Sequence, residues 1–421
     1  MSQQRIAVIG LGYVGLPLAV ALARHFLVTG FDINQGRIAE LKSGHDRTGE
    51  VATKKLRTSS LKLSAEASDI KGADIYIVTV PTPVTADNKP DLTPLHSACK
   101  TVGGAMSKGA IVVFESTVYP GLTETICGPA LEQASGLRAG SDFFLGYSPE
   151  RINPGDHVHS VEKIVKVVAG QTAEITEILA KIYGSMTEGG VHRARSIQVA
   201  EAAKVIENAQ RDINIAFINE VTMICQRLGV SVHDVLETAG TKWNFLPFRP
   251  GLVGGHCIGV DPFYLAECAL TLGHHPEIIL AGRKINDQMS DFIAGRITDA
   301  LDGKPSRILV LGLTFKENVP DLRNTKVVDL IEGLRRRGHD VSAHDAIADA
   351  EEARHEYGLT LLPNLSQGGY DAVIGAVAHT VYANFTDTEL TRLVRPGGLV
   401  ADIKGQWRSL ALPDGLKRWE L

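Results

Sequence analysis

Short apolar runs alternate with amphipathic segments from residue 5 to about residue 195. Short apolar runs of this kind predict strands, and the amphipathic segments between them predict helices. The predicted strands are residues 6–9, 28–31, 75–80, 111–115, 144–147 and 164–168. Regular alternation of strand and helix is typical of βαβ units, whose strands lie parallel in one sheet. We therefore predict a doubly wound α/β domain in this part of the chain.

A long helix is predicted after this domain, because apolar residues recur at helical spacing from Ser196 until Leu228 and Gly229 end the pattern. The apolar positions are Val199, Ala203, Ile206, Ala209, Ile213, Phe217, Val221 and Ile224. A second βαβ region begins at residues 308–312, with later strands near 340–343, 372–377 and 399–403. The expected fold class is α/β, with two Rossmann-like doubly wound parallel-sheet domains joined by a long central helix. The expected domains are residues 1–195, 196–300 and 301–421.

Composition narrows the class of protein. A chain of 421 residues is too long for one hydrophobic core. A net charge of -5 argues against a nucleic-acid partner, and no apolar run is long enough to span a membrane. The first residues run directly into a strand, which leaves no room for a signal peptide. Five scattered cysteines make no disulfide framework and favour a reducing compartment, so we expect a cytoplasmic protein.

A glycine motif lies between the first strand and the first helix, at Gly10-Leu11-Gly12-Tyr13-Val14-Gly15. The first glycine permits a tight turn, the second lets the backbone approach a pyrophosphate, and the third permits close packing of helix on sheet. The pyrophosphate would then rest on the amides at the start of the helix. The motif thus predicts a dinucleotide site, and the alternative is a tight turn in some other α/β protein.

The choice of dinucleotide depends on the end of the second strand. Asp32 lies there, and a carboxylate at this place can bind both ribose hydroxyls and repel a 2′-phosphate. NAD is therefore favoured over NADP, although a nearby guanidinium at Arg37 could accommodate the phosphate. Two later loops should line the same crevice, and their candidate cofactor contacts are Pro81, Thr82, Ser116 and Thr117. The alternative for the proline is that it only terminates a strand.

A single thiol stands among small residues at Gly254-Gly255-His256-Cys257, with Asp261 four residues later. A lone cysteine is more often a small hydrophobe than a nucleophile. Together with an oxidant, however, a thiol can capture an aldehyde as a thiohemiacetal, allow a second oxidation and release an acid by hydrolysis of the thioester. We expect the flanking glycines to let the backbone approach a ligand closely.

Polar residues on the long helix are candidate partners of this thiol. Lys204, Asn208 and Arg211 share one helix face by their spacing, and the first two are donors suited to a developing oxyanion. The alternative is that these three residues form a polar stripe exposed to solvent, with no role at the thiol. Asp261 and Glu150 are candidate acid/base groups for the hydrolytic water.

These residues resemble the UDP-glucose/GDP-mannose dehydrogenase family of NAD-dependent four-electron enzymes over nearly the full chain. The matching elements are the glycine motif with Leu16 and Pro17, Glu115-Ser116-Thr117 with Pro120 and Gly121, Ser148-Pro149-Glu150, Lys204 with Asn208, Gly254 to Cys257 with Asp261, and Phe315-Lys316 with Asp321 and Arg323. The resemblance implies Cys257 as nucleophile, with Lys204, Asn208 and Asp261 as its oxyanion and water partners. It also implies that Thr117 and Glu150 handle protons and that Lys316 contacts the sugar, with Arg323 and His256 nearby. A dimer interface along the long helix is implied as well, and no metal is.

The sequence departs from the UDP-glucose pattern after Glu150. Glucose enzymes continue with an apolar pair and a second glutamate, whereas this chain has Arg151-Ile152-Asn153-Pro154. The departure resembles the branch that acts on UDP-N-acetylhexosamines, in particular the Vi-antigen and O-antigen enzymes of bacterial surface polysaccharides. The glucose enzymes' intersubunit arginine has no match at Thr241, and Arg249 is a possible substitute. We therefore predict UDP-GlcNAc or UDP-GalNAc as substrate, with UDP-ManNAc or UDP-glucose as alternatives.

Two other classes remain open. A two-electron β-hydroxyacid dehydrogenase can share the glycine motif and a helix-borne lysine and asparagine, but it needs no cysteine. A non-catalytic dinucleotide-sensing scaffold needs neither the cysteine nor the helix-borne lysine and asparagine. The three classes differ in stoichiometry, with two, one or no NADH formed per substrate.

Overall fold

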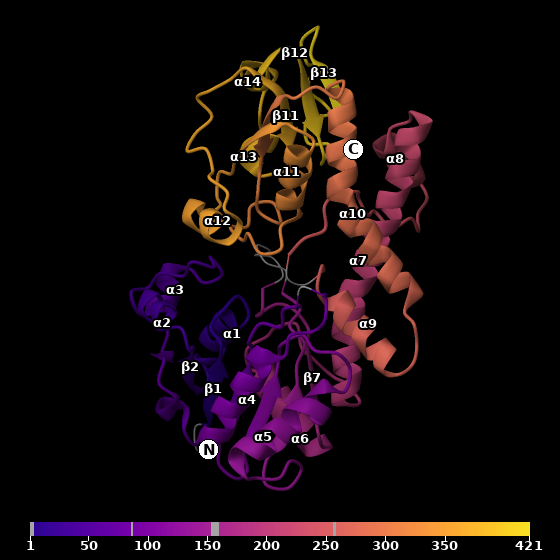
Figure 1. Cartoon of the computed structure of the whole chain (residues 1–421). Helices are drawn as coiled ribbons and strands as arrows, with labels where there is room; N and C mark the ends of the chain where they lie inside the picture. The colour runs from indigo at the N-terminus through magenta and orange to yellow at the C-terminus, as the bar shows by residue number, and fades with distance from the viewer. Residues whose placement is uncertain (1–3, 86, 153–159, 256–257) are drawn as a thin grey trace. The chain divides into compact units, whose positions relative to one another are not determined.

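The computed structural model describes residues 4–85, 87–152, 160–255 and 258–421. The chain divides into two compact units. The first unit comprises Met1–Asn208 and Phe263–His275, and the second comprises Ala209–Pro262 and Pro276–Leu421. Figure 1 follows the chain from indigo at its start to yellow at its end. The division into three domains that the sequence predicted is not tested by these two units and stays a prediction.

The first unit is built on one sheet, in which the described strands follow the order β3-β2-β1-β4-β5-β6-β7-β8. The strands are β1 (Arg5–Ile9), β2 (Leu27–Phe31), β3 (Lys62–Ser64), β4 (Ile75–Val78), β5 (Ile111–Phe114), β6 (Phe144–Tyr147), β7 (Lys166–Gly170) and β8 (Val191–Arg193). The order 3-2-1-4-5-6 is that of a dinucleotide-binding sheet, in which ligands lie beyond the carboxyl ends of the strands.

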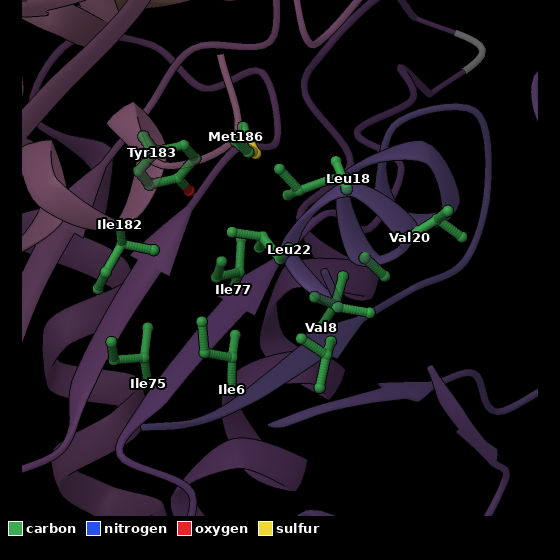
Figure 2. Close-up of a cluster of buried hydrophobic side chains, with 14 of the residues drawn as sticks. Ile6, Val8, Leu18, Val20, Leu22, Ile75, Ile77, Ile182, Tyr183 and Met186 are labelled. Atoms are coloured by element: carbon green, nitrogen blue, oxygen red, sulfur yellow. The ribbon is translucent and has the colours of Figure 1, made fainter. Parts of the chain in front are cut away.

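Helices cover both faces of this sheet because every strand near its centre is apolar on both sides. The helices are α1 (Gly15–Leu22), α2 (Gln35–Lys42), α3 (Thr53–Arg57), α4 (Thr93–Ala105), α5 (Gly128–Ser135) and α6 (Ala173–Gly184). Successive side chains of a strand point to opposite faces. Ile75 and Ile77 accordingly belong to one core cluster with residues of α1 and α6, whereas Tyr76 and Val78 belong to another with residues of α4 and α5. Figure 2 shows the first cluster.

One strand pair departs from the predicted parallel sheet. β6 and β7 are antiparallel, with Gly146 opposite Gly170 and Tyr147 opposite Ala169. Parallel neighbours need a crossover that is usually a helix. The described part of the connection between β6 and β7 contains no helix, in agreement with an antiparallel pair. β7 begins and ends two residues beyond the predicted strand at 164–168.

The second unit contains most of a long helix and a smaller parallel sheet. α7 (Ile197–Leu228) begins in the first unit and continues into the second. The sheet order is β10-β9-β11-β12-β13, and every described pair in it is parallel. Its strands are β9 (Arg307–Leu311), β10 (Asp340–His344), β11 (Tyr370–Gly375), β12 (Val394–Asp402) and β13 (Lys417–Glu420). The other helices of the second unit are α8 (Val232–Ala239), α10 (Glu277–Ala300), α11 (Lys326–Arg336), α12 (Ala350–Tyr357), α13 (Thr380–Ala383) and α14 (Asp387–Leu393). α9 (Asp261–Thr271) begins in the second unit, and from Phe263 onward it belongs to the first.

The predicted fold class is confirmed, since two doubly wound sheets and a long helix are present. The sequence missed β3, β8 and β13, which are short and polar. Within the described residues, no helix is long and apolar enough to cross a lipid bilayer.

A buried polar chain in the second unit holds the loop that leads toward Cys257. The Asn219 side chain on α7 donates to the Gly251 carbonyl at 3.0 Å and accepts from the Gly251 amide at 2.9 Å. Asn219 also donates to Asn286, which donates to Asp212, and Arg283 donates to the same carboxylate at 2.6 Å. Each of these four side chains is almost fully buried. Because buried polar groups are costly to leave unpaired, this network fixes the backbone at Gly251.

Candidate functional site

The glycine loop begins where β1 ends. Gly10 has a φ of 93°, a left-handed conformation that favours glycine, and its amide donates to the Phe31 carbonyl at 2.8 Å. Thr79, which follows β4, donates its hydroxyl to the Gly10 carbonyl at 2.7 Å. The turn is thus held from both neighbouring strands, and Thr79 is a contributor that sequence reasoning missed.

The other two glycines of the motif have different surroundings. A Cβ on Gly15 would overlap the Gly10 carbonyl and the Thr79 hydroxyl, so this position requires glycine for internal packing. A Cβ on Gly12 would meet nothing within 4 Å. The loop therefore leaves open space at Gly12, where a ligand can approach the backbone. Val14 gives no side-chain cap to α1, so the helix start can take an anion such as a pyrophosphate.

Asp32 is fixed at the end of β2 by two backbone donors. One oxygen accepts the Leu11 amide at 2.9 Å and the other accepts the Asn34 amide at 2.9 Å. A carboxylate accepts about four hydrogen bonds, so capacity for ribose hydroxyls remains. The residues present fit a dinucleotide, with the open loop for its pyrophosphate and Asp32 for its ribose.

Arg37 supports this loop from beneath. Its Nε donates to the Leu11 carbonyl at 3.0 Å, and its two terminal nitrogens donate to Glu40 and Asp46 at 2.9 and 2.7 Å. Burial raises the pKa of Asp46, but hydrogen bonds from Thr48 and Arg37 hold that pKa below its ordinary value. The sequence suggested Arg37 as a direct cofactor contact. The structure buries the guanidinium among protein acceptors, so its role here is to hold the loop.

The loops after β4 and β5 are joined to each other and to α7. The Ser116 hydroxyl donates to the Val80 carbonyl at 2.6 Å, next to exposed Pro81 and half-buried Thr82. Thr117 is half-buried, and the loop that follows it is held by Glu201 of α7. The Glu201 carboxylate accepts the amides of Gly121 and Thr123, and burial raises its pKa. Glu201 was missed in the sequence, where one acidic residue on an apolar helix face gave no signal.

A cluster of buried charges lies at the same edge of the sheet. The Lys166 ammonium, at the start of β7, is 3.0 Å from Glu115 after β5 and 3.5 Å from Glu150 after β6. Tyr183 of α6 donates its hydroxyl to Glu115, and the Lys166 ammonium lies over its ring at 5.3 Å. Burial raises the pKa of Glu115 to about 7, against the attraction of Lys166. Burial alone would lower the pKa of Lys166, but the two carboxylates hold that pKa above its ordinary value.

Glu150 is held by its own neighbours in the chain. One carboxylate oxygen accepts the amides of Arg151 and Ile152, each at 2.6 Å, and the other oxygen faces Lys166. The Arg151 guanidinium is half-exposed and pairs with Glu207 of α7 at 2.7 Å. Asn153 lies outside the described residues.

Of the three polar residues predicted on one face of α7, Lys204 and Asn208 are both buried and each about 8% exposed. Arg211 is exposed. Lys204 and Asn208 are therefore enclosed donors, whereas Arg211 is exposed to solvent, although all three were predicted to share one helix face.

In the second unit, the glycines before Cys257 pack against their own chain. A Cβ on Gly254 would lie 2.6 Å from the Asn324 carbonyl, and one on Gly255 would lie 2.8 Å from the Phe315 ring. The side of each glycine where a Cβ would lie is thus closed by protein, and the predicted approach of their backbone to a ligand stays a prediction. His256 and Cys257 lie outside the described residues. Asp261, at the start of α9, is buried.

The candidate sugar contacts of the second unit are more accessible. Lys316 is half-buried, Arg249 is exposed, and Arg323 pairs with buried Asp321 at 2.8 Å. Asp345, which follows β10, accepts the amides of Leu313 and Thr314 after β9. This arrangement repeats the one in which Asp32 holds the loop after β1.

The strand order, the open glycine loop and the placement of Asp32 define a dinucleotide-binding protein with a second Rossmann-like unit. Three models of the UDP-glucose/GDP-mannose dehydrogenase family match this chain, the NAD binding domain at residues 4–187, the central domain at 198–288 and the UDP binding domain at 309–409. The chain belongs to this family and is an NAD-dependent oxidoreductase.

Curated relatives and solved structures agree with the assignment. The chain is 52% identical to protein CapL of Staphylococcus aureus over 99% of this chain and 100% of that protein. It is 51% identical to a UDP-N-acetyl-D-glucosamine 6-dehydrogenase of Pseudomonas aeruginosa over 96% and 97% of the two chains. A UDP-D-ManNAc dehydrogenase from Pyrococcus horikoshii superposes with a TM-score of 0.88 at 29% identity, over 99% of each chain.

The two alanine substitutions Gly12→Ala and Gly15→Ala should change different properties, the first NAD binding and the second the stability of the fold. Gly12→Ala should leave the thermal midpoint nearly unchanged but weaken NAD binding by about tenfold or more, since its methyl group enters the ligand space. Gly15→Ala should lower stability by roughly 1–3 kcal/mol, because its methyl group overlaps protein atoms. Calorimetric NAD titration and thermal unfolding of both variants check this. Normal NAD affinity in Gly12→Ala would contradict the placement of the pyrophosphate.

Proposed function

We propose that this protein oxidises the C6 hydroxyl of a UDP-N-acetylhexosamine, UDP-GlcNAc or UDP-GalNAc, to the uronic acid. The observation that carries the proposal is the 51% identity, over nearly the whole chain, to a UDP-N-acetyl-D-glucosamine 6-dehydrogenase. Identity to the UDP-D-ManNAc dehydrogenase structure is 29% over a similar extent. The higher whole-chain identity to the first protein favours its sugar class over that of the second.

The segment after Glu150 supports an acetamido sugar. Arg151 and Ile152 give their amides to the Glu150 carboxylate, and the Arg151 side chain is drawn toward Glu207. The second carboxylate of the glucose pattern is missing from this run. A pocket built for an acetamido group loses contacts when glucose binds, so glucose should be the poorer substrate.

The residues that would hold NAD are the loop at Gly10, Gly12 and Gly15, the α1 amides and Asp32. Bound NAD supplies the hydride acceptor for each of the two oxidations. Pro81, Thr82, Ser116 and Thr117 are our proposed further contacts, at the carboxyl ends of β4 and β5.

The chain's own chemistry centres on Cys257. Its thiolate adds to the C6 aldehyde formed in the first oxidation and gives a thiohemiacetal. Loss of hydride from that carbon in the second oxidation gives a thioester. Water then attacks the thioester and releases the carboxylate and the thiol. One alcohol, two NAD⁺ and one water thus give one carboxylate, two NADH and three protons.

The polar residues handle the charge and protons of this sequence. Lys204 and Asn208 donate to the oxygen that becomes negative in both tetrahedral species. Glu150 accepts the proton of the hydrolytic water, with Asp261 as the alternative base. Thr117 passes the proton of the C6 hydroxyl to solvent water, where the three protons of the overall reaction are released. Lys316, Arg323, Gly254 and His256, with Arg211 and Arg249, are the remaining proposed substrate contacts.

We also propose a homodimer along α7. Val199, Ile206, Phe217, Ile224 and Leu228 are each about half exposed or more, and their spacing places them on one stripe of the helix. An apolar stripe of this length on a charged chain is typical of a protein interface. The oxidation would serve bacterial surface polysaccharide synthesis in the cytoplasm, where a reduced thiol is maintained.

Phe217→Asp should therefore convert the dimer to a monomer, because a carboxylate would be buried in the middle of the apolar stripe. Sedimentation at matched concentrations measures this. The control is Val381→Asp, which places the same charge on an exposed apolar position of α13 and should leave the sedimentation unchanged. An unchanged dimer in Phe217→Asp would contradict the α7 interface.

Cys257→Ser should lose overall turnover by about a thousandfold or more while still binding NAD and UDP-sugar, since serine is the poorer nucleophile near neutral pH and its ester the less reactive intermediate. Uronate formation and calorimetric binding check the two parts separately. Uronate formed at near the wild-type rate would rule out the thioester route.

UDP-GlcNAc and UDP-GalNAc should each be oxidised with a higher kcat/KM than UDP-glucose, with two NADH formed per uronate. Initial rates on UDP-GlcNAc, UDP-GalNAc, UDP-ManNAc and UDP-glucose, with product quantified by mass spectrometry, measure both quantities. A UDP-glucose value equal to or above those of both acetamido sugars would contradict the substrate class. One NADH per turnover would instead indicate a two-electron dehydrogenase.

A further inference from the structure

Lys166 is a fully buried cation that the proposed chemistry does not use. Its side chain is 0% exposed, as is that of Glu115, and the Glu150 side chain is 8% exposed. Burying an ion pair costs several kcal/mol of desolvation, and an apolar group of similar volume is often as stabilising. Stability alone is therefore a weak reason for a lysine between two carboxylates at this position.

The antiparallel strand explains how Lys166 reaches this edge of the sheet. Tyr147 on β6 lies opposite Ala169 on β7, and the two strands run in opposite directions. Continuing this register three residues along each strand brings Glu150 and Lys166 opposite each other, in agreement with the 3.5 Å between them. A parallel β7 would have started at the other edge. The reversal of β7 thus places an ammonium group where the carboxyl ends of β5 and β6 meet.

The contacts of the cluster divide it into a rear and a front. At the rear, Glu115 accepts hydrogen bonds from Lys166 and from Tyr183, so its two oxygens are both engaged. At the front, one Glu150 oxygen accepts two backbone amides, and the other is held by the charge of Lys166 at a distance longer than a hydrogen bond. That second oxygen keeps its lone pairs for a further donor.

We propose that Lys166 is a positioning residue for Glu150, supplying the positive charge that fixes its carboxylate for proton transfer from the hydrolytic water. Glu115 and Tyr183 hold Lys166 in place from behind. The inference rests on the proposed function, in which Glu150 helps to activate the water that hydrolyses the Cys257 thioester. Removing the Lys166 charge should consequently slow the hydrolytic step more than either oxidation.

Lys166→Met tests this, because methionine keeps most of the side-chain volume without the charge. Its kcat should fall by about tenfold to a hundredfold, a fraction of what acid/base catalysis contributes, while the KM for UDP-GlcNAc stays within about threefold. Rapid mixing should show a burst of about two NADH per site before the slow steady state, since a thioester accumulates. The matched control is Lys163→Met, an exposed lysine in the same segment, which should behave as wild type.

The double variant Lys166→Met/Glu115→Gln separates positioning from simple neutralisation. Lys166→Met alone leaves the buried Glu115 carboxylate without its positive partner, which could prevent folding. The double variant also removes this carboxylate, so the net charge of the cluster is that of the wild type. If Lys166 served only to neutralise Glu115, the double variant would recover the kcat of Glu115→Gln alone, and the proposal would be overturned. The proposal expects the double variant to fold, to keep the low kcat and to keep the burst.

Glu150→Gln in the same assays distinguishes this inference from the proposed function. Slow hydrolysis with a burst in Glu150→Gln, beside wild-type kinetics in folded Lys166→Met, would overturn only the role of Lys166. Wild-type kinetics in Glu150→Gln would remove Glu150 from the chemistry and with it the positioning role. A lowered kcat without a burst in Lys166→Met would show that an oxidation step has slowed, and would equally overturn the proposal.

Discussion

The carboxyl edge of the first sheet is the constraint on which the other features depend. Parallel pairing of β1, β4 and β5 brings Gly10, Thr79 and Glu115 to one edge, because each follows directly after its strand. The hydroxyl of Thr79 then closes the glycine turn, and Ser116 joins its loop to the one after β4. The glycine loop and the buried charges are thus neighbours as a result of strand register, before any specific side-chain contact is considered.

The buried charges show where stability is given up at this edge. Glu115 and Lys166 are removed from water, and burial raises the pKa of Glu115 to about 7. A carboxyl whose pKa is higher in the folded chain than in the unfolded chain favours folding at low pH. This contribution falls as the pH rises from the ordinary value near 4.5 toward 7. At neutral pH Glu115 therefore opposes folding, whereas Lys166, whose pKa the two carboxylates raise, favours it, so the two members of the pair act in opposite directions.

The sequence predicted features that depend on nearby residues and missed those that depend on distant ones. The glycine loop and Asp32 form within one βαβ unit, so their spacing was sufficient. The contact between Lys166 and Glu115 spans 51 residues and needs the antiparallel β7, which no local pattern marks. Glu201 holds the amide of Thr123 across 78 residues, for the same reason. Gly255 was predicted to let the backbone approach a ligand, and no local pattern indicated that the Phe315 ring packs against this glycine.

The repeated loop in the second unit has a consequence for the order of events in catalysis. There Asp345 takes the amides of Leu313 and Thr314, while its other oxygen takes those of Ile347 and Ala348, so this loop is occupied by its own chain. In the described residues, the open glycine loop is that of the first unit. In the four-electron oxidation that we propose, both hydrides then leave through one nicotinamide position in succession. In that proposed sequence the half-oxidised sugar has to outlast an exchange of coenzyme, and the proposed bond to Cys257 would keep it from diffusing away.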